Sequence, residues 1–135
     1  ELSPDILVQS EETPRSDRHH SILIAEDVYE NYFLLETLFG KQYQLYHALN
    51  GQEAIDMFET YHPDLILMDI KMPVMDGFEA TRRIRTLSKT IPIIALTAFA
   101  FEREKEIAKQ CEFTDYVVKP IDIKELKKLI AKVLA

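Results

Sequence analysis

Short apolar runs alternate with amphipathic stretches along most of this chain. The apolar runs are Ile22–Ala25, Gln44–Ala48, Leu65–Met68, Ile93–Leu96 and Tyr116–Val118. A strand that is buried on both faces is apolar at successive positions, whereas a half-exposed strand alternates apolar with polar residues. Most of these runs are continuously apolar. They therefore predict the strands of a parallel sheet that is covered on both faces.

The stretches between the runs have the period and the end signals of helices. The first is expected over Val28–Phe39 and ends at Gly40, and the fourth, over Phe101–Gln110, is highly charged. The other three begin with a cap residue and a glutamate three positions later: Asn50 and Glu53, Asp76 and Glu79, Asp122 and Glu125. In the helix after Asn50 the side chains expected to face inward are Ala54, Ile55, Phe58 and Tyr61. Five strands interleaved with five helices predict a doubly wound α/β fold.

The chain length and the composition of its start suggest the domain organisation. The 135 residues fit one domain of common size, which we expect at 21–135. Residues 1–20 carry prolines, serines and charged side chains with one short apolar stretch, a composition typical of linkers. This segment is read as a linker or as the tail of a preceding domain, and a disordered terminus is an equally open interpretation.

Charge and residue usage exclude several function classes. Sixteen Lys and Arg stand against 23 Asp and Glu, a formal charge of -7, which argues against nucleic acid as a direct ligand. No apolar run approaches the ~18 residues of a membrane span, so no membrane contact is expected. With only three glycines, neither a dinucleotide fingerprint nor a Walker A loop can be written. The single cysteine, Cys111, excludes an internal disulfide framework and favours a reducing, cytoplasmic setting.

Polar residues follow four of the five predicted strands directly. They are Glu26 and Asp27 after the first, Asp69 after the third, Thr97 after the fourth and Lys119 after the fifth. Only the second strand ends without a matching polar group. In an open parallel sheet, ligands bind beyond the carboxyl ends of the strands. We therefore expect these side chains to form one site.

Three carboxylates brought together repel one another unless a cation offsets their charge. With oxygen ligands alone, and no His or Cys at Glu26, Asp27 or Asp69, the cation expected is Mg²⁺, or Mn²⁺, rather than zinc. Lys119 would add a positive charge and Thr97 a hydroxyl donor, groups that suit a phosphoryl oxygen. The combination indicates phosphate chemistry on an aspartate.

Four segments carry a resemblance to a known family. They are IAED at 24–27, MDIKMPVMDG at 68–77, ALTA at 95–98 and DYVVKP at 115–120. Through them the chain, over about residues 21–135, resembles the receiver domain of two-component response regulators. The resemblance implies a flavodoxin-like sheet with the strand order 2-1-3-4-5.

The resemblance also implies roles for individual residues. Asp69 would accept a phosphoryl group from a phosphohistidine on a partner, either a histidine kinase or a histidine phosphotransfer domain. The implied metal ligands are Glu26 (through water), Asp27, Asp69 and the carbonyl of Lys71. Lys119 and Thr97 would hold phosphoryl oxygens, and Thr97 and Tyr116 would form the conformational switch. The Lys119–Pro120 bond is expected to be cis, as in the family.

Three further segments are similar to one branch of the family. Residues 30–31, 76–81 and 121–122 are most like the receivers at the carboxyl end of hybrid histidine kinases, in which case the parent chain would be a histidine kinase. Glu26 stands where many members have Asp, and residues 111–113 (CEF) stand where a glycine usually precedes the last strand. His19, His20, His47 and His62 are not expected to donate phosphate within the chain.

Three functions remain to be weighed. The first is a phosphoaccepting receiver, an enzyme only in that it catalyses its own phosphorylation and dephosphorylation, which would signal to a downstream output domain. The second is a pseudo-receiver, a protein-binding module that works without phosphorylation, although all four chemical positions are filled. The third, a phosphohydrolase with a D-x-D motif, fails because Lys71 occupies the second acidic position.

Overall fold

The computed structural model describes residues 20–98 and 102–135, so the segment expected to be a linker lies outside it apart from His20. Five parallel strands form one sheet in the order β3-β2-β4-β5-β6. The strands are β2 (Ser21–Ala25), β3 (Gln44–Ala48), β4 (Leu65–Asp69), β5 (Ile93–Thr97) and β6 (Asp115–Val118). Numbered along the chain, this is the expected order 2-1-3-4-5, and the prediction of a doubly wound α/β fold is confirmed.

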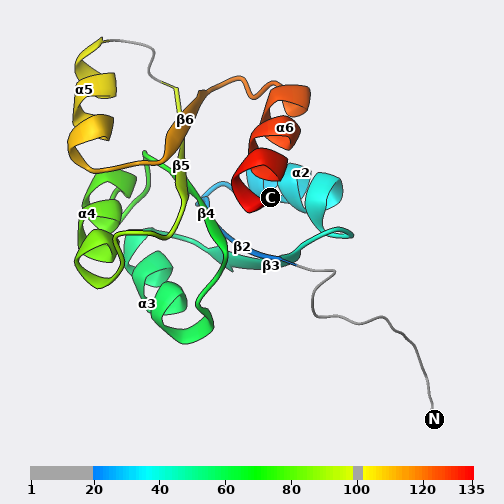
Figure 1. Cartoon of the computed structure of the whole chain (residues 1–135), viewed down its shortest axis with the longest axis horizontal. Coiled ribbons are helices and arrows are strands. Elements are labelled where there is room, and N and C mark those ends of the chain that lie inside the picture. Colours follow the sequence, from blue (N-terminus) through cyan, green and yellow to red (C-terminus); the bar gives the residue numbers. More distant parts are fainter. Residues whose placement is uncertain (1–19, 99–101) are drawn as a thin grey trace.

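Helices cover both faces of the sheet (Figure 1). They are α2 (Tyr29–Phe39), α3 (Gly51–Tyr61), α4 (Gly77–Leu87), α5 (Glu102–Gln110) and α6 (Ile123–Leu134). Helices α2 and α6 lie together on one face, and α3, α4 and α5 lie on the other. Within the described residues no helix is long and apolar enough to cross a lipid bilayer.

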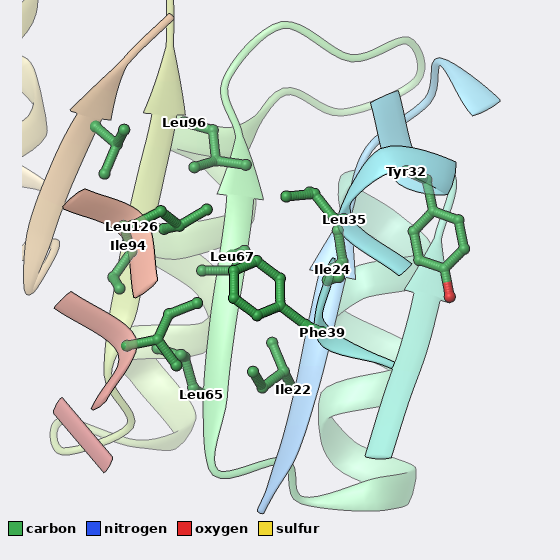
Figure 2. Packing of buried hydrophobic residues seen from close by; sticks show 12 residues of the cluster. Ile22, Ile24, Tyr32, Leu35, Phe39, Leu65, Leu67, Ile94, Leu96 and Leu126 are labelled. Atoms are coloured by element: carbon green, nitrogen blue, oxygen red, sulfur yellow. The ribbon is translucent and has the colours of Figure 1, made fainter. Parts of the chain in front are cut away.

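The continuous apolar runs are explained by two hydrophobic clusters, one on each face. In β2, Ile22 and Ile24 pack into the cluster under α2 and α6, while Leu23 and Ala25 pack into the cluster under α3 and α4. Figure 2 shows the first cluster, in which the buried ring of Phe39 from α2 lies over Leu67 of β4. Because successive side chains of a strand point to opposite faces, every position of the central strands β4 and β5 is buried.

The helix starts match the sequence prediction closely. The side chains of Asn50, Asp76 and Asp122 accept hydrogen bonds from the backbone N–H three residues later, at 2.9, 2.9 and 3.2 Å. Helix α2 is different, because Val28 occupies its cap position and provides no side-chain hydrogen bond.

One expected core residue is exposed. Tyr61, predicted to face inward, is 46% exposed, so that prediction is wrong. Its ring stacks instead on Tyr46 of β3, with the centroids 4.2 Å apart. Strand β3 is an edge of the sheet, and the last turn of α3 ends beside that edge rather than over the buried middle strands.

The turn that lacks the family's glycine adopts the conformation a glycine would favour. Glu112 has φ 64°, in the left-handed region. The N–H of Phe113 donates to the carbonyl of Ala108 at 3.3 Å and the N–H of Glu112 to that of Lys109 at 3.0 Å, which is the Schellman pattern of a helix end. The buried guanidinium of Arg85 donates from Nε to the carbonyl of Glu112 at 2.9 Å and so holds the strained turn in place.

Candidate functional site

Parallel pairing brings the polar residues that follow the strands to one edge of the sheet. The register places Ala25 beside Met68, Asp69 beside Leu96, and Thr97 beside Val118. The residues that follow or end β2, β4, β5 and β6 therefore lie side by side at the carboxyl edge. This is where an open parallel sheet binds its ligands.

Three carboxylates meet at this edge. Glu26, Asp27 and Asp69 each offer an oxygen atom, and these atoms lie within 4.8 Å of one another. Glu26 is 1% exposed and Asp69 5% exposed. An ionised carboxylate only accepts hydrogen bonds, so these three groups cannot satisfy one another. Oxygen-only ligand sets of this kind suit Mg²⁺ and related hard cations.

Lys119 contacts this cluster with its ammonium group. Its Nζ lies 3.1 Å from Oδ2 of Asp69 and 3.6 Å from Oε1 of Glu26. The single positive charge of Lys119 does not offset the charges of three carboxylates. The donor set and its charge therefore fit a divalent cation. The Lys119–Pro120 peptide bond is cis, as the resemblance implied.

Burial and charge together shift the pKa of Glu26. Burial, the main cause, and the nearby Asp69 carboxylate raise the pKa of Glu26 above its ordinary value. The backbone N–H of Val28, which donates to Oε2 at 3.0 Å, and the Lys119 ammonium act in the opposite direction. The longer side chain of glutamate thus reaches a loop N–H while its carboxylate stays in the cluster.

The loop after Asp69 is closely packed against the strand end. The N–H of Gly77 donates to the carbonyl of Ile70 at 2.8 Å, and a Cβ at position 77 would collide with the carbonyl oxygen of Asp69. Val74 in the same loop has φ 71°, a strained conformation for a β-branched residue. Lys71 lies two residues after Asp69 in this loop and its side chain is exposed.

Thr97 and Tyr116 both line a small cavity. Thr97 ends β5 and is buried, whereas Tyr116 on β6 is 37% exposed. The cavity, of about 10 Å³, is lined by both residues and by Ile70, Phe78 and Ala108 among others. The Tyr116 ring faces Lys105 of α5, whose Nζ lies 5.8 Å from the ring centroid. The aromatic ring thus lies near the surface, next to an internal space beside Thr97.

Sequence reasoning missed one residue at this edge. His47 of β3, the strand thought to lack a polar group at its end, has its Nε2 2.7 Å from the carbonyl oxygen of Glu26. Its ring stacks on Tyr32 of α2 with centroids 3.7 Å apart. One feature of the sequence could have indicated His47. It is the last residue but one of the predicted strand Gln44–Ala48, and that strand is expected to pair with the first strand, which Glu26 follows.

Apolar side chains surround the site on the outer surface. Those exposed on α2 and on the loops at the carboxyl edge are Val28, Tyr29, Phe33, Leu34, Leu49 and Val74. Tyr29 and Phe33 stack with their ring centroids 6.1 Å apart. Apolar side chains concentrated around a polar cluster are typical of surfaces that contact another protein.

A protein-family model and curated relatives match most of the chain. The model described as the response regulator receiver domain matches residues 22–131. Regulatory protein AtoC of Escherichia coli is 38% identical over 114 residues, which cover 84% of this chain but 25% of that protein. Sporulation initiation phosphotransferase F of Bacillus subtilis is 34% identical over 117 residues, 86% of this chain and 94% of that protein. The chain thus spans a small part of one relative and nearly all of the other.

Solved structures with the same fold include two that are relevant to the site. The receiver domain of the sensor histidine kinase PA1611 from Pseudomonas aeruginosa, with a magnesium ion coordinated in its active-site cleft, has a TM-score of 0.80 and 34% identity, covering 86% of this chain and 98% of that one. The receiver domain of Ssk1, in complex with the histidine phosphotransfer protein Ypd1 of Saccharomyces cerevisiae, belongs to a structure that matches with a TM-score of 0.79 and 30% identity, covering 85% and 88%.

Proposed function

Since this chain belongs to the response regulator receiver domain family of two-component systems, we propose that Asp69 accepts a phosphoryl group from a phosphohistidine of a partner protein. One observation carries this assignment. Asp69 is the carboxylate at which the neighbouring acids and the Lys119 ammonium converge, 3.1 Å from Nζ. A nucleophilic carboxylate at this position would lie beside a positively charged ammonium group and beside other carboxylates.

The proposed transfer is a single displacement at phosphorus. A carboxylate oxygen of Asp69 attacks the phosphorus of the donor, the phosphorus–nitrogen bond to the donor imidazole breaks, and an acyl phosphate forms on Asp69. The imidazole nitrogen keeps the electron pair of the broken bond and takes up a proton. Hydrolysis would later return the carboxylate and release inorganic phosphate.

The chain's own residues have distinct parts in this transfer. Lys119 would hold a phosphoryl oxygen with its ammonium group, and Thr97, at the end of the neighbouring strand, would donate its hydroxyl to another. Asp27 and Asp69 would ligate Mg²⁺, or Mn²⁺, together with the Lys71 carbonyl, and Glu26 would contact it through water. The ion, when bound, would neutralise charge on the transferred group.

The partner would dock on the apolar surface around the site. Receiver domains of this family interact with histidine kinases or phosphotransfer proteins and with output domains. On this chain, exposed Tyr29 and Phe33 on α2 and Val74 beside the acceptor loop offer a surface where a phosphohistidine helix could rest. We expect this to happen in the cytoplasm, at the carboxyl end of a hybrid histidine kinase, with residues 1–20 as its linker and 21–135 as the receiver.

Intact mass after incubation with acetyl phosphate and Mg²⁺ tests the phosphoacceptor. The wild type should gain one phosphoryl group that hydroxylamine removes, and Asp69→Asn should gain none. Asp56→Asn, on the exposed face of α3, is the matched control and should behave as the wild type. A wild-type chain that gains no phosphate from a small donor or a phosphohistidine partner would instead be a pseudo-receiver. An Asp69→Asn variant that still gains a phosphoryl group would show that another residue is the acceptor.

Comparing two donors tests the docking surface. Phe33→Ser should slow transfer from a phosphorylated histidine phosphotransfer protein and leave labelling by acetyl phosphate unchanged. Tyr61→Ser, an exposed aromatic away from α2, should slow neither reaction. Equal transfer rates from the protein donor in wild type and Phe33→Ser would show that the partner does not dock on this part of α2.

A further inference from the structure

His47 holds the backbone that carries two of the metal-site acids. It lies on the edge strand β3 beside Ile24 of β2, and its Nε2 is 2.7 Å from the carbonyl oxygen of Glu26. A carbonyl oxygen only accepts hydrogen bonds, so this ring nitrogen is the donor. The bond reaches the peptide group that joins Glu26 to Asp27.

A second hydrogen bond from β3 also holds the main chain of Glu26. The backbone N–H of Glu26 donates to the carbonyl of Ala48 at 3.0 Å. With its N–H bound to Ala48 and its carbonyl bound to His47, the main chain of Glu26 is held by β3 at both of its polar groups. The direction in which the chain leaves toward Asp27 follows from these two bonds.

Tyr32 fixes the plane of the imidazole. The two rings are parallel, with an interplanar angle of 0° and centroids 3.7 Å apart. Tyr32 is 7% exposed, on the buried side of α2. A ring held between a packed aromatic and a backbone acceptor loses little further freedom when it makes its hydrogen bond.

We propose that His47 is a positioning residue for the metal site, holding the Glu26–Asp27 peptide so that both carboxylates stay directed at the ion. The proposal rests on the proposed function, because it assumes that these acids bind Mg²⁺. Magnesium demands near-ideal octahedral geometry, so a displaced ligand weakens binding. Outer groups that orient metal ligands typically change affinity by about 10–100-fold when removed.

Two substitutions separate the hydrogen bond from the ring. His47→Phe keeps an aromatic ring against Tyr32 but has no donor, and His47→Gln keeps an N–H donor the same number of bonds from Cα but has no ring. We expect His47→Phe to weaken Mg²⁺ binding about tenfold and His47→Gln to stay within about threefold of wild type. Isothermal titration of the unphosphorylated domain measures this affinity directly.

A purely structural role predicts a different order. If His47 only fills space beside Tyr32, His47→Phe should bind Mg²⁺ as the wild type does and His47→Gln should be the more damaged variant. Urea unfolding of both variants without Mg²⁺ measures the change in stability separately from the change in affinity. A wild-type affinity in His47→Phe would overturn the positioning role.

Asp27→Asn distinguishes this proposal from the one on which it rests. If Asp27→Asn abolishes Mg²⁺ binding while His47→Phe leaves it unchanged, the metal site stands and the role of His47 is wrong. If neither wild type nor Asp27→Asn binds the ion, the metal site itself is wrong. Tyr32→Phe keeps the stacked ring and is expected to match the wild type.

Discussion

Replacing Glu26 by glutamine should stabilise the magnesium-free protein. Glu26 is 1% exposed, and its carboxylate lies among charges of both signs. Glutamine has nearly the same shape, and its carbonyl oxygen can still accept the hydrogen bond from the Val28 N–H, which is 3.0 Å from Oε2 in the wild type. The substitution therefore removes a charge with little change in packing.

The charges around Glu26 act in both directions, and burial adds to the side that disfavours its carboxylate. With an effective dielectric constant near 20, attraction to Lys119 at 3.6 Å is about 5 kcal/mol. Asp69 and Asp27 each place an oxygen within 4.8 Å of a Glu26 oxygen, so each repulsion is at least about 3 kcal/mol. Removing a carboxylate from water costs several kcal/mol on its own. We therefore expect Glu26→Gln to raise the free energy of unfolding, by about 1 kcal/mol if the effect is of the size usual for a single substitution.

The pH dependence has a defined direction. The folded protein raises the pKa of Glu26 above its ordinary value of 4.5, mainly through burial. The folded state thus binds this proton more tightly than the unfolded state, and the destabilisation by Glu26 appears as pH rises from 4.5 through the folded pKa. The advantage of Glu26→Gln should be full at neutral pH and shrink toward pH 4.5.

Urea unfolding in EDTA at neutral and acidic pH measures both effects. Glu59→Gln, an exposed glutamate of α3, is the control and should change stability by less than about 0.5 kcal/mol. Adding Mg²⁺ should stabilise the wild type more than Glu26→Gln, because binding to the folded state adds to stability. A less stable Glu26→Gln without Mg²⁺ would refute the reasoning and show that attraction to Lys119 outweighs burial.

Three further predictions concern the turn, the switch and the core. Glu112→Gly should stabilise the domain by about 1 kcal/mol by relieving the positive φ, whereas Glu112→Ala, which keeps a Cβ, should not; equal unfolding midpoints for the two variants would contradict this. Thr97→Ala should still allow Asp69 to be phosphorylated but uncouple the phosphorylation from Tyr116. Beryllofluoride, which mimics the phosphoryl group, should therefore change fewer amide chemical shifts on α5, β6 and α6 than in wild type. Equal changes in the two proteins would show that Thr97 is not part of the switch. Phe39→Ala should cost about 3–5 kcal/mol, measured by urea unfolding, because its ring is buried in the cluster under α2 and α6; a cost under about 1 kcal/mol would mean that the cluster refills the space.

Much of the fold could be predicted because its signals are local. The apolar runs, the three capping pairs around Asn50, Asp76 and Asp122, and the lengths between them depend on residues that are neighbours in the chain. Burial on both faces of the sheet is also visible locally, since it makes successive strand residues apolar. Tyr61 was misjudged because helical period indicates a face of the helix but not where the sheet beneath it ends.

The candidate site could be predicted in its residue types but not in its contacts. Parallel strands bring their carboxyl ends together, so acids after separate strands were expected to meet, and Glu26, Asp27 and Asp69 do. The distances from Lys119 to two of these acids, and the burial of Glu26 that raises its pKa, depend on how the loops pack against the sheet edge.

The parts that required tertiary structure join segments with no local relation. Arg85 and Glu112 are 27 residues apart in the chain, and the bond between them holds a left-handed turn without glycine. His47 and Glu26 are 21 residues apart, and they meet because β3 pairs beside β2. Residue patterns encode the strands, the helix ends and the acids, whereas contacts across the sheet depend on packing that brings distant segments together, and those contacts decide the charge state and the rigidity of the site.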